Sequence, residues 1–298
     1  MRVFYSDHYT LDLPEGHRFP KEKYALLRQA LRDEGIVTDA DLRDSPLASR
    51  EELLRAHTAE YVDAVLGGTL DAKRQRRIGF PWSATLVDRS RASVGGQLAA
   101  ARGALEDGIA GNLAGGTHHA HADFGSGYCV FNDIAVAALT LLAERRIERA
   151  AIVDLDVHQG DGNAAILGDD ARVFIFSMHG ATNFPFVKVP STLDVALPDG
   201  TGDDTYLARL DEALPAVLAF APDLVFYQAG VDPLAEDRLG KLSLTHAGLY
   251  ARDLRVLRAC RDRRIPVALS LGGGYARPIS ASVEAYANTY RAARAVFG

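Results

Sequence analysis

Residues 151–163 read AIVDLDVHQGDGN, an apolar run that ends in three carboxylates, one imidazole and two glycines. Its first half carries Ile152, Val153 and Leu155, the composition of a strand that is buried on both faces of a parallel sheet. We expect a strand over 151–156, with polar side chains gathered at its carboxyl end. Ligands bind at that edge of an open parallel sheet. This stretch therefore predicts an α/β fold and places a site within it.

Short apolar runs alternate with longer amphipathic segments through the rest of the chain. Further strands are predicted at 3–5, 112–114, 173–177, 224–228 and 267–271. Helices are predicted at 21–34, 50–66, 85–108, 132–146, 204–220, 245–263 and 279–296. Ser49 and Glu52 form a capping-box pattern before the second helix, whereas Gly95-Gly96 weaken the third and Pro215 predicts a kink or a break. Alternation of this kind predicts a mostly parallel sheet covered by helices.

The composition is that of a globular protein with one large core. Of 298 residues, 48% are hydrophobic, and no linker, low-complexity tract or repeat divides the chain. We therefore expect a single domain over 1–298. The two cysteines, Cys129 and Cys260, provide neither a disulfide framework nor a thiolate metal site, which fits a cytoplasmic protein. The first residues lack an apolar signal segment, so no association with a membrane is expected.

The charge balance bears on possible partners. Thirty-three basic and 39 acidic residues give a net charge of −6. This balance argues against non-specific attraction to nucleic acid, and no direct nucleic-acid partner is expected. It is compatible with a cationic substrate, but an acidic surface that only aids solubility is the better explanation.

Side chains at two predicted strand ends have the chemistry of a metal site. Residues two apart on a strand share a face, so Asp154, Asp156 and His158 are expected to point together. Asp232 follows the strand predicted at 224–228 and is the candidate third ligand beside Asp156 and His158. Such a set leaves positions open for water and substrate, as a catalytic Zn²⁺ requires. An Asp before Pro is also typical of a turn or a helix cap, so Asp232 alone leaves both readings open.

Two further motifs offer acid/base and hydrogen-bonding groups. The segment GGTHH places His118 and His119 after a glycine turn, and imidazole titrates near neutral pH. The segment GGGY follows another predicted strand and places the Tyr275 phenol where it can donate a hydrogen bond to an oxyanion. Each motif has an ordinary alternative, a loop histidine beside a core histidine in the first case and a flexible glycine turn in the second.

Taken together and in this order, the motifs resemble the histone deacetylase family, within the wider arginase/deacetylase fold. The resemblance covers about residues 16–290 and rests on GTHHA, GYCVFND, DLDVHQGDG, AGVD, DRLG and GGGY, which begin at residues 116, 127, 154, 229, 237 and 272. It implies an α/β fold of three αβα layers with a mostly parallel central sheet. The pair His158-Gln159, where familiar eukaryotic members often carry two histidines, is similar to class IV and bacterial relatives.

The resemblance implies a zinc-dependent deacetylase, an amidohydrolase that cleaves the amide of an acylated amine such as acetyl-lysine. By position, the implied zinc ligands are Asp156, His158 and Asp232. Tyr275 is the implied partner of the substrate carbonyl. His118 and His119 are the implied catalytic pair, oriented by Asp154 and Asp161 respectively. A structural K⁺ is implied near Asp154, with the carbonyls of Asp156 and His158 and groups around Ser177 and Met178.

The resemblance also implies a narrow channel for the aliphatic stem of the substrate, with Gly127, Tyr128 and Phe184 at its walls. Both aromatic residues are equally typical of an ordinary core. The segment FPWSA at 80–84 holds no acid to match the aspartate that contacts the substrate backbone in several eukaryotic members. This departure bears on peptide recognition and leaves the hydrolytic centre intact.

Several alternatives stay open at this point. The substrate is an acylated lysine peptide, an acetylpolyamine or another small acylated amine, and Fe²⁺ or Co²⁺ suits the same ligands as Zn²⁺. A two-metal ureohydrolase of the same fold is disfavoured because it needs additional carboxylate ligands. A non-catalytic sensor of acylated ligands is the alternative of another class, although none of the groups needed for catalysis is missing from the sequence.

Overall fold

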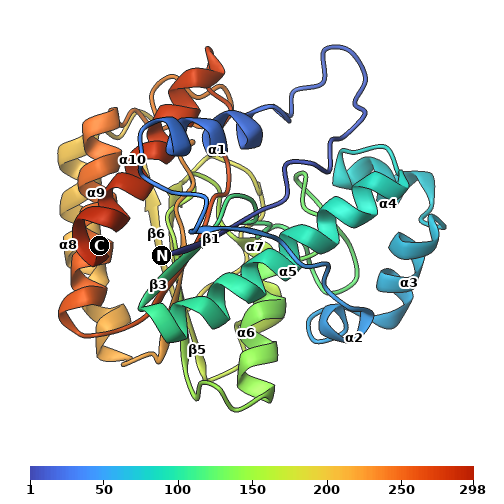
Figure 1. Cartoon of the computed structure of the whole chain (residues 1–298), viewed down its shortest axis with the longest axis horizontal. Helices are drawn as coiled ribbons and strands as arrows, with labels where there is room; N and C mark the ends of the chain where they lie inside the picture. Colours follow the sequence, from blue (N-terminus) through green and yellow to red (C-terminus); the bar gives the residue numbers. More distant parts are fainter.

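The computed structural model describes all residues, 1–298, and its eight strands form one sheet (Figure 1). The strands are β1 (Arg2–Tyr5), β2 (Leu42–Asp44), β3 (Ile109–Asn112), β4 (Ala150–Asp154), β5 (Val173–Gly180), β6 (Leu193–Leu197), β7 (Leu224–Gln228) and β8 (Val267–Ser270). Their order across the sheet is β2-β1-β3-β8-β7-β4-β5-β6, and all neighbouring pairs are parallel. The expected mostly parallel sheet is confirmed, and it contains no antiparallel strand.

Helices flank the sheet on both faces. They are α1 (Lys23–Asp33), α2 (Arg50–Leu53), α3 (Ala59–Gly67), α4 (Ala72–Ile78), α5 (Ala84–Asp107), α6 (Asp133–Ala143), α7 (Asp161–Leu167), α8 (Asp203–Ala219), α9 (His246–Asp262) and α10 (Ile279–Phe297). In Figure 1, α1, α8, α9 and α10 lie on one side of the sheet, and α5 and α6 lie on the other. The short helices α2, α3 and α4 extend beyond α5. This arrangement confirms the three-layer αβα fold.

Three helix predictions meet different outcomes. The segment predicted as one helix over 50–66 forms two, because Thr58 starts a new helix by accepting a hydrogen bond from the Tyr61 backbone N–H. Helix α8 continues through Pro215, and its buried face outweighs the one helical hydrogen bond that proline removes. Helix α5 is unbroken at its glycine pair. A Cβ at Gly95 would lie 2.0 Å from the Pro46 carbonyl oxygen, so this glycine permits close packing of a neighbouring segment.

Strand boundaries differ from the predictions mainly near the ends. Strand β4 ends at Asp154 and not at residue 156, so the segment that follows it is a loop. Strand β3 lies at Ile109–Asn112, ahead of the predicted 112–114. The edge strands β2 and β6 were not predicted, because β2 has three residues and both expose part of their side chains.

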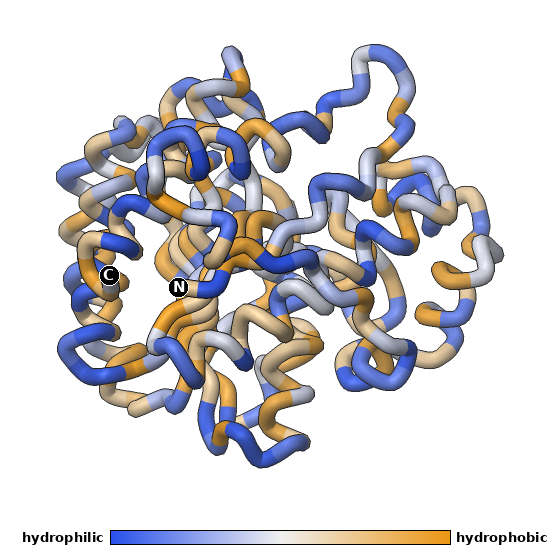
Figure 2. Tube along the Cα trace, in the orientation of Figure 1, coloured by the Kyte–Doolittle hydropathy of each residue, from blue (hydrophilic) through white to orange (hydrophobic).

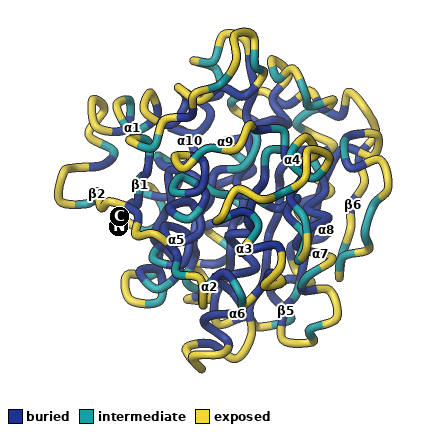
Figure 3. Tube along the Cα trace, turned by 90° about the vertical axis from the view of Figure 1, so that its right-hand side faces the viewer, coloured by how far each residue is buried: buried dark blue, intermediate teal, exposed yellow.

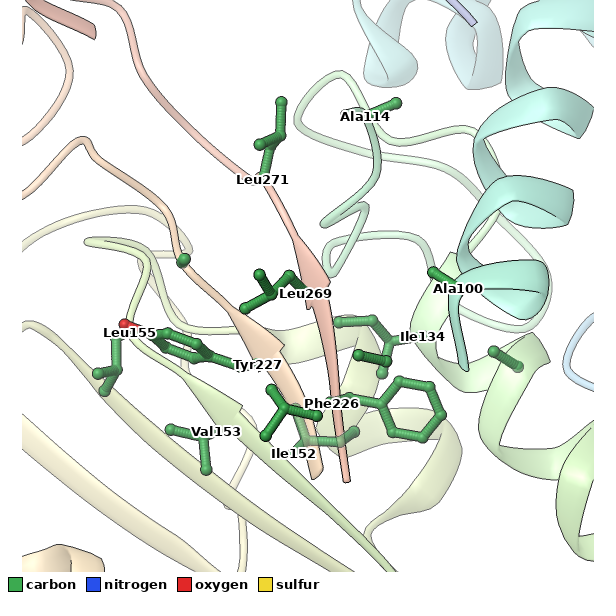
Figure 4. Close-up of a cluster of buried hydrophobic side chains, with 14 of the residues drawn as sticks. Ala100, Ala114, Ile134, Ile152, Val153, Leu155, Phe226, Tyr227, Leu269 and Leu271 are labelled. Carbon is green, nitrogen blue, oxygen red and sulfur yellow. The ribbon is translucent and has the colours of Figure 1, made fainter. Parts of the chain in front are cut away.

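The core forms where the sheet meets its helices. Figure 4 shows Ile152 of β4 and Phe226 of β7 on the face of the sheet where Ile134 of α6 lies, and Val153 of β4 and Leu269 of β8 on the other face. All five are buried, and each such side chain contributes about 1.5–3 kcal/mol. Apolar residues gather in this interior in Figure 2, and Figure 3 shows the exposed residues on the outer helices and loops. The central strands are therefore tightly packed up to their carboxyl ends.

No helix combines the length and the apolar composition that a membrane-spanning segment requires.

Candidate active site

The three predicted metal ligands converge at the carboxyl edge of the sheet. Asp156 and His158 lie in the loop after β4, and Asp232 lies in the loop after its neighbour β7. Their candidate ligand atoms all lie within 4.8 Å of one another. The His158 Nδ1 atom is 3.0 Å from an Asp156 oxygen and 3.1 Å from an Asp232 oxygen. The structure thus brings together residues that are 74 positions apart in the chain.

Hydrogen bonds within the loops, and not strand pairing, hold this triad. Because β4 ends at Asp154, the strand periodicity that predicted a shared face does not extend to Asp156 and His158. Asp232 instead accepts a hydrogen bond from the Val157 backbone N–H at 2.9 Å, and Asp156 accepts one from the Gly273 N–H at 2.6 Å. A Cβ at Gly273 would lie 1.9 Å from an Asp232 oxygen, so the glycine allows the main chain to pass directly beside the ligands.

The charges at the triad suit a divalent cation. Burial and the Asp156 charge raise the pKa of Asp232 to about 7. Burial lowers the pKa of His158, but hydrogen bonds to Asp156 and Asp232 outweigh it and raise the pKa to about 10. The two buried carboxyl groups thus favour positive charge at the position of His158. Two oxygens and one nitrogen are ligands that Zn²⁺ accepts, and a metal cation at this position would supply that positive charge.

The two adjacent histidines each bind the predicted carboxylate. His118 Nδ1 lies 2.8 Å from Asp154, and His119 Nδ1 lies 2.6 Å from Asp161. Burial lowers the pKa of His118, but the Asp154 and Asp156 charges outweigh it and raise the pKa to about 9. Burial and the His118 charge lower the pKa of His119 to about 3. His119 is therefore the neutral imidazole of the pair, and its Nε2 atom has no hydrogen-bond partner within the chain.

The loop that carries the histidines is anchored to the start of α6. The Asp133 carboxylate accepts hydrogen bonds from the backbone N–H groups of Gly116 and Thr117 at 2.9 and 2.8 Å. The Asn132 side chain caps α6 through the Ala135 N–H and donates to the carbonyl of Ala120. The residues FND in the sequence motif thus position the catalytic candidates while remaining fully buried themselves.

A third histidine, which sequence reasoning missed, binds the same carboxylate as His119. His121 Nε2 lies 2.9 Å from the second oxygen of Asp161, and the His121 ring stacks on Phe124 at 4.2 Å between centroids. Asp161 is therefore held between two imidazoles. The available signal was the spacing of His119 and His121 within HHAH, residues 118–121.

Tyr275 is placed to interact with a ligand. Its phenol lies in the cavity wall, and no group in the chain accepts a hydrogen bond from its hydroxyl. Its main chain is fixed by Asp237, which accepts from the Tyr275 N–H at 2.6 Å. The Lys23 ammonium, a second group that sequence reasoning missed, is buried and donates to the carbonyls of Gly272 and Gly274 at 3.2 and 3.4 Å.

One cavity of about 890 Å³ joins these groups. Its wall includes most of the predicted site residues, namely His118, His119, Gly127, Tyr128, Asp156, His158, Asp161, Phe184 and Tyr275. The Phe184 ring meets the His119 ring edge-on at 4.9 Å, and the Tyr128 and Tyr275 rings lie 6.2 Å apart. Asp154 and Asp232 are buried and do not line the cavity. The aromatic residues are thus walls of the cavity and also part of the packed structure around it.

This arrangement defines a class: an α/β protein with an Asp-His-Asp triad that could hold a divalent metal and two carboxylate-bound histidines at the edge of a parallel sheet. The chain belongs to the histone deacetylase family, because the family model described as "Histone deacetylase domain" matches residues 17–290.

Individual relatives agree with the family. An uncharacterized protein of Picosynechococcus sp. is 47% identical over 99% of both chains. Histone deacetylase 2 of Arabidopsis thaliana is 33% identical over 95% of this chain and 77% of its own length. A probable deacetylase of Archaeoglobus fulgidus is 32% identical over 92% and 80%. The solved HDA15 HD domain shares the fold, with a TM-score of 0.81, 22% identity and coverage of 98% of this chain and 90% of its own.

Proposed function

We propose that the protein is a zinc-dependent amidohydrolase that removes the acyl group from an acylated amine such as acetyl-lysine. The observation that carries the proposal is the meeting of three groups around one cavity: the triad of Asp156, His158 and Asp232, the neutral His119 and the unpartnered Tyr275 hydroxyl. The names of the Arabidopsis and Archaeoglobus relatives, a histone deacetylase and a probable deacetylase, support the same reaction.

The triad would hold the metal. A bound Zn²⁺ lowers the pKa of a water molecule and polarises the amide carbonyl. Fe²⁺ suits the same ligand set and is the alternative cation. We also propose a structural K⁺ near Asp154, which would use carbonyl and hydroxyl oxygens around Asp156, His158, Ser177 and Met178. The buried Asp154 carboxylate and Ser177 hydroxyl supply two of the oxygen atoms that such a cation prefers.

The protein groups divide the proton transfers of amide hydrolysis. His119 accepts a proton from the attacking water at Nε2, while Asp161 holds its Nδ1–H and fixes the tautomer. The Tyr275 hydroxyl donates a hydrogen bond to the carbonyl oxygen as negative charge develops there. His119 then returns the proton to the departing nitrogen as the C–N bond breaks. The products are a free amine and a carboxylic acid, and His118 with Asp154 stays a fixed ion pair beside the reaction.

The cavity walls would orient the substrate. Gly127, Tyr128 and Phe184 line the route from the surface to His119, which suits the aliphatic stem of an acylated lysine. Apolar walls exclude water from the stem and leave the amide as the polar group that meets the metal and Tyr275. A substrate held in this way needs few polar contacts outside the reacting centre.

The test is release of free amine from acetyl-lysine peptides by metal-stripped and zinc-restored protein. Activity that returns with zinc supports the proposal. Tyr275→Phe should reduce turnover about 10²-fold or more while zinc content stays the same. Asp232→Ala should lose both activity and zinc. Full activity in both variants, or an absence of hydrolysis in zinc-loaded protein across acetyl and longer acyl amides, would refute it and favour a binding role.

A further inference from the structure

The charged residues around the cavity discriminate between classes of acylated amine. Among the residues of the cavity wall, the only carboxylates are Asp156 and Asp161. Asp156 belongs to the metal triad, and Asp161 already accepts from His119 and His121. An acylated polyamine carries further ammonium groups beyond its amide, and these would lie toward the surface without a carboxylate to meet them. The cavity therefore lacks the charge that a polycationic substrate requires.

The surface end of the cavity carries cations instead. We call this region the mouth and define it by its exposed wall residues, Arg77, Thr182, Phe186, Val187 and Lys241. Arg77 makes no ion pair with any carboxylate, and its guanidinium stacks on the Phe124 ring at 3.5 Å. Asp123 lies next to Phe124 in the chain but forms no ion pair with Arg77.

Neighbouring charges reinforce this cation. Lys73 and Arg76 are exposed on the same helix, α4, and form no ion pair either. Arg74 is the residue of α4 that is compensated, through Glu60 at 2.8 Å. Lys241 at the mouth is partly compensated by Asp199 at 3.9 Å. Arg77 is thus the cation of the mouth that has no carboxylate partner, and Lys73 and Arg76 add positive charge on the same helix.

Apolar side chains form another part of the mouth. Phe186 and Val187 are 86% and 84% exposed, the highest values among the exposed large hydrophobic residues. Phe186 packs edge-on against Phe184, which continues the apolar wall inward to His119. The loop is held in this shape by the Lys188 ammonium, which donates to the Asn183 and Pro185 carbonyls at 2.6 and 2.5 Å. A mouth that carries both a cation and an apolar surface favours a ligand that has both an anionic and an apolar group.

We infer that the substrate is an acylated lysine within a protein segment that carries acidic and apolar residues next to the lysine. This inference rests on the proposed function and names its substrate class. Carboxylates of the segment would meet Arg77, and an apolar side chain would cover Phe186 and Val187. Acetylpolyamines are disfavoured substrates.

The test compares kcat/KM for matched acetyl-lysine peptides on zinc-loaded protein. Peptides with Glu and Leu next to the lysine should exceed peptides with Lys or Arg at the same positions by about three- to tenfold, mostly through KM. The ratio should shrink as salt is added, because exposed charges are screened. N-acetylputrescine and N-acetylspermidine should be the poorest substrates. Equal rates for the two peptides, or a preference for the basic peptide or a polyamine, would overturn the inference.

Two charge reversals locate the effect. Arg77→Glu should abolish or invert the preference for the acidic peptide, whereas Arg258→Glu, the same change at an exposed residue of α9 outside the cavity, should retain it. An Arg77→Glu protein with an unchanged preference would overturn the assignment. Phe186→Ser should remove the gain from the flanking Leu without affecting the gain from Glu.

Peptide binding separates this inference from the proposed hydrolysis. If zinc-loaded protein hydrolyses no acylated amine, the proposed function fails. Fluorescence anisotropy of the labelled peptides then tests separately whether the mouth binds acidic peptides. Tighter binding of the acidic peptide that is lost in Arg77→Glu would support recognition of acidic peptides at the mouth. Equal binding of acidic and basic peptides would overturn it.

Discussion

Arg252 offers the most stringent test of how the fold supports the site. It is fully buried on α9, and its guanidinium pairs with Asp253 at 2.8 Å. It also donates to the carbonyls of Gly230 at 2.6 Å and Leu155 at 3.2 Å. These carbonyls lie in the two loops that carry the metal triad, so one buried cation connects both loops to the helix behind them.

The expected cost of Arg252→Met follows from what the substitution leaves behind. Methionine fills much of the space but leaves Asp253 as an uncompensated buried carboxylate and two carbonyls without this donor. Loss of one partner of a buried ion pair costs about 3–5 kcal/mol. For a chain of this size, about 2 °C per kcal/mol gives a fall in Tm of roughly 6–10 °C. Zinc affinity should fall as well, because the two loops lose a common anchor.

The assay is urea and thermal unfolding of wild type, Arg252→Met, Asp253→Asn and the double variant, with zinc affinity from competition with a chromogenic chelator. The double variant should be more stable than Arg252→Met alone, because neutral Asn removes the uncompensated charge and still accepts from Tyr227 or Thr289. An Arg252→Met protein within about 1 kcal/mol of wild type would refute the reasoning.

Three further outcomes are expected. His121→Phe should lower kcat about tenfold with KM and zinc content unchanged, because Asp161 loses its second hydrogen-bond donor. His121→Gln should restore much of the lost kcat. Equal kcat values for wild type and His121→Phe in steady-state kinetics would show that His121 has no positioning role. Gly273→Ala should abolish zinc binding by displacing a ligand carboxylate, whereas Gly202→Ala, whose Cβ meets its nearest atom only at 3.8 Å, should bind zinc normally by metal analysis. Burial and a neighbouring imidazolium lower the pKa of His119 to about 3, and a bound cation would lower it further. A plot of kcat/KM against pH should therefore show no loss of activity on the acid side with a pKa near 6.5, the ordinary value for histidine. A decrease in kcat/KM between about pH 8 and pH 5 that follows a pKa near 6.5 would contradict this.

The central part of the fold was readable from sequence because its signals are local. Strands such as β4 and β7 are continuous apolar runs, and their burial on both faces leaves little ambiguity. The edge strands β2 and β6 were missed since partial exposure gives them mixed composition. The break before α3 was missed because the Thr58 cap lies within a helical pattern of apolar residues.

The sequence identified most residues of the candidate site, but it did not predict how they come together. The motifs identified the triad and the two histidines, and the structure brings them together. Position along a strand did not explain their convergence, because Asp156 and His158 are fixed by bonds to distant main-chain groups such as Gly273. Lys23 and His121 were missed for the same reason: their roles depend on contacts across the fold that no short segment displays.

The place of β8 in the sheet has a consequence for biosynthesis. The last strand in the chain lies between β3 and β7, near the middle of the sheet. Until residues 267–270 leave the ribosome, the earlier strands can pair only as two half-sheets, β2-β1-β3 and β7-β4-β5-β6, in which β3 and β7 are unpaired inner edges. Such edges are sites of wrong pairing between chains. Aggregation during translation should therefore concentrate in the interval before β8 is released, when chaperones that cover exposed strands would have the greatest effect on yield.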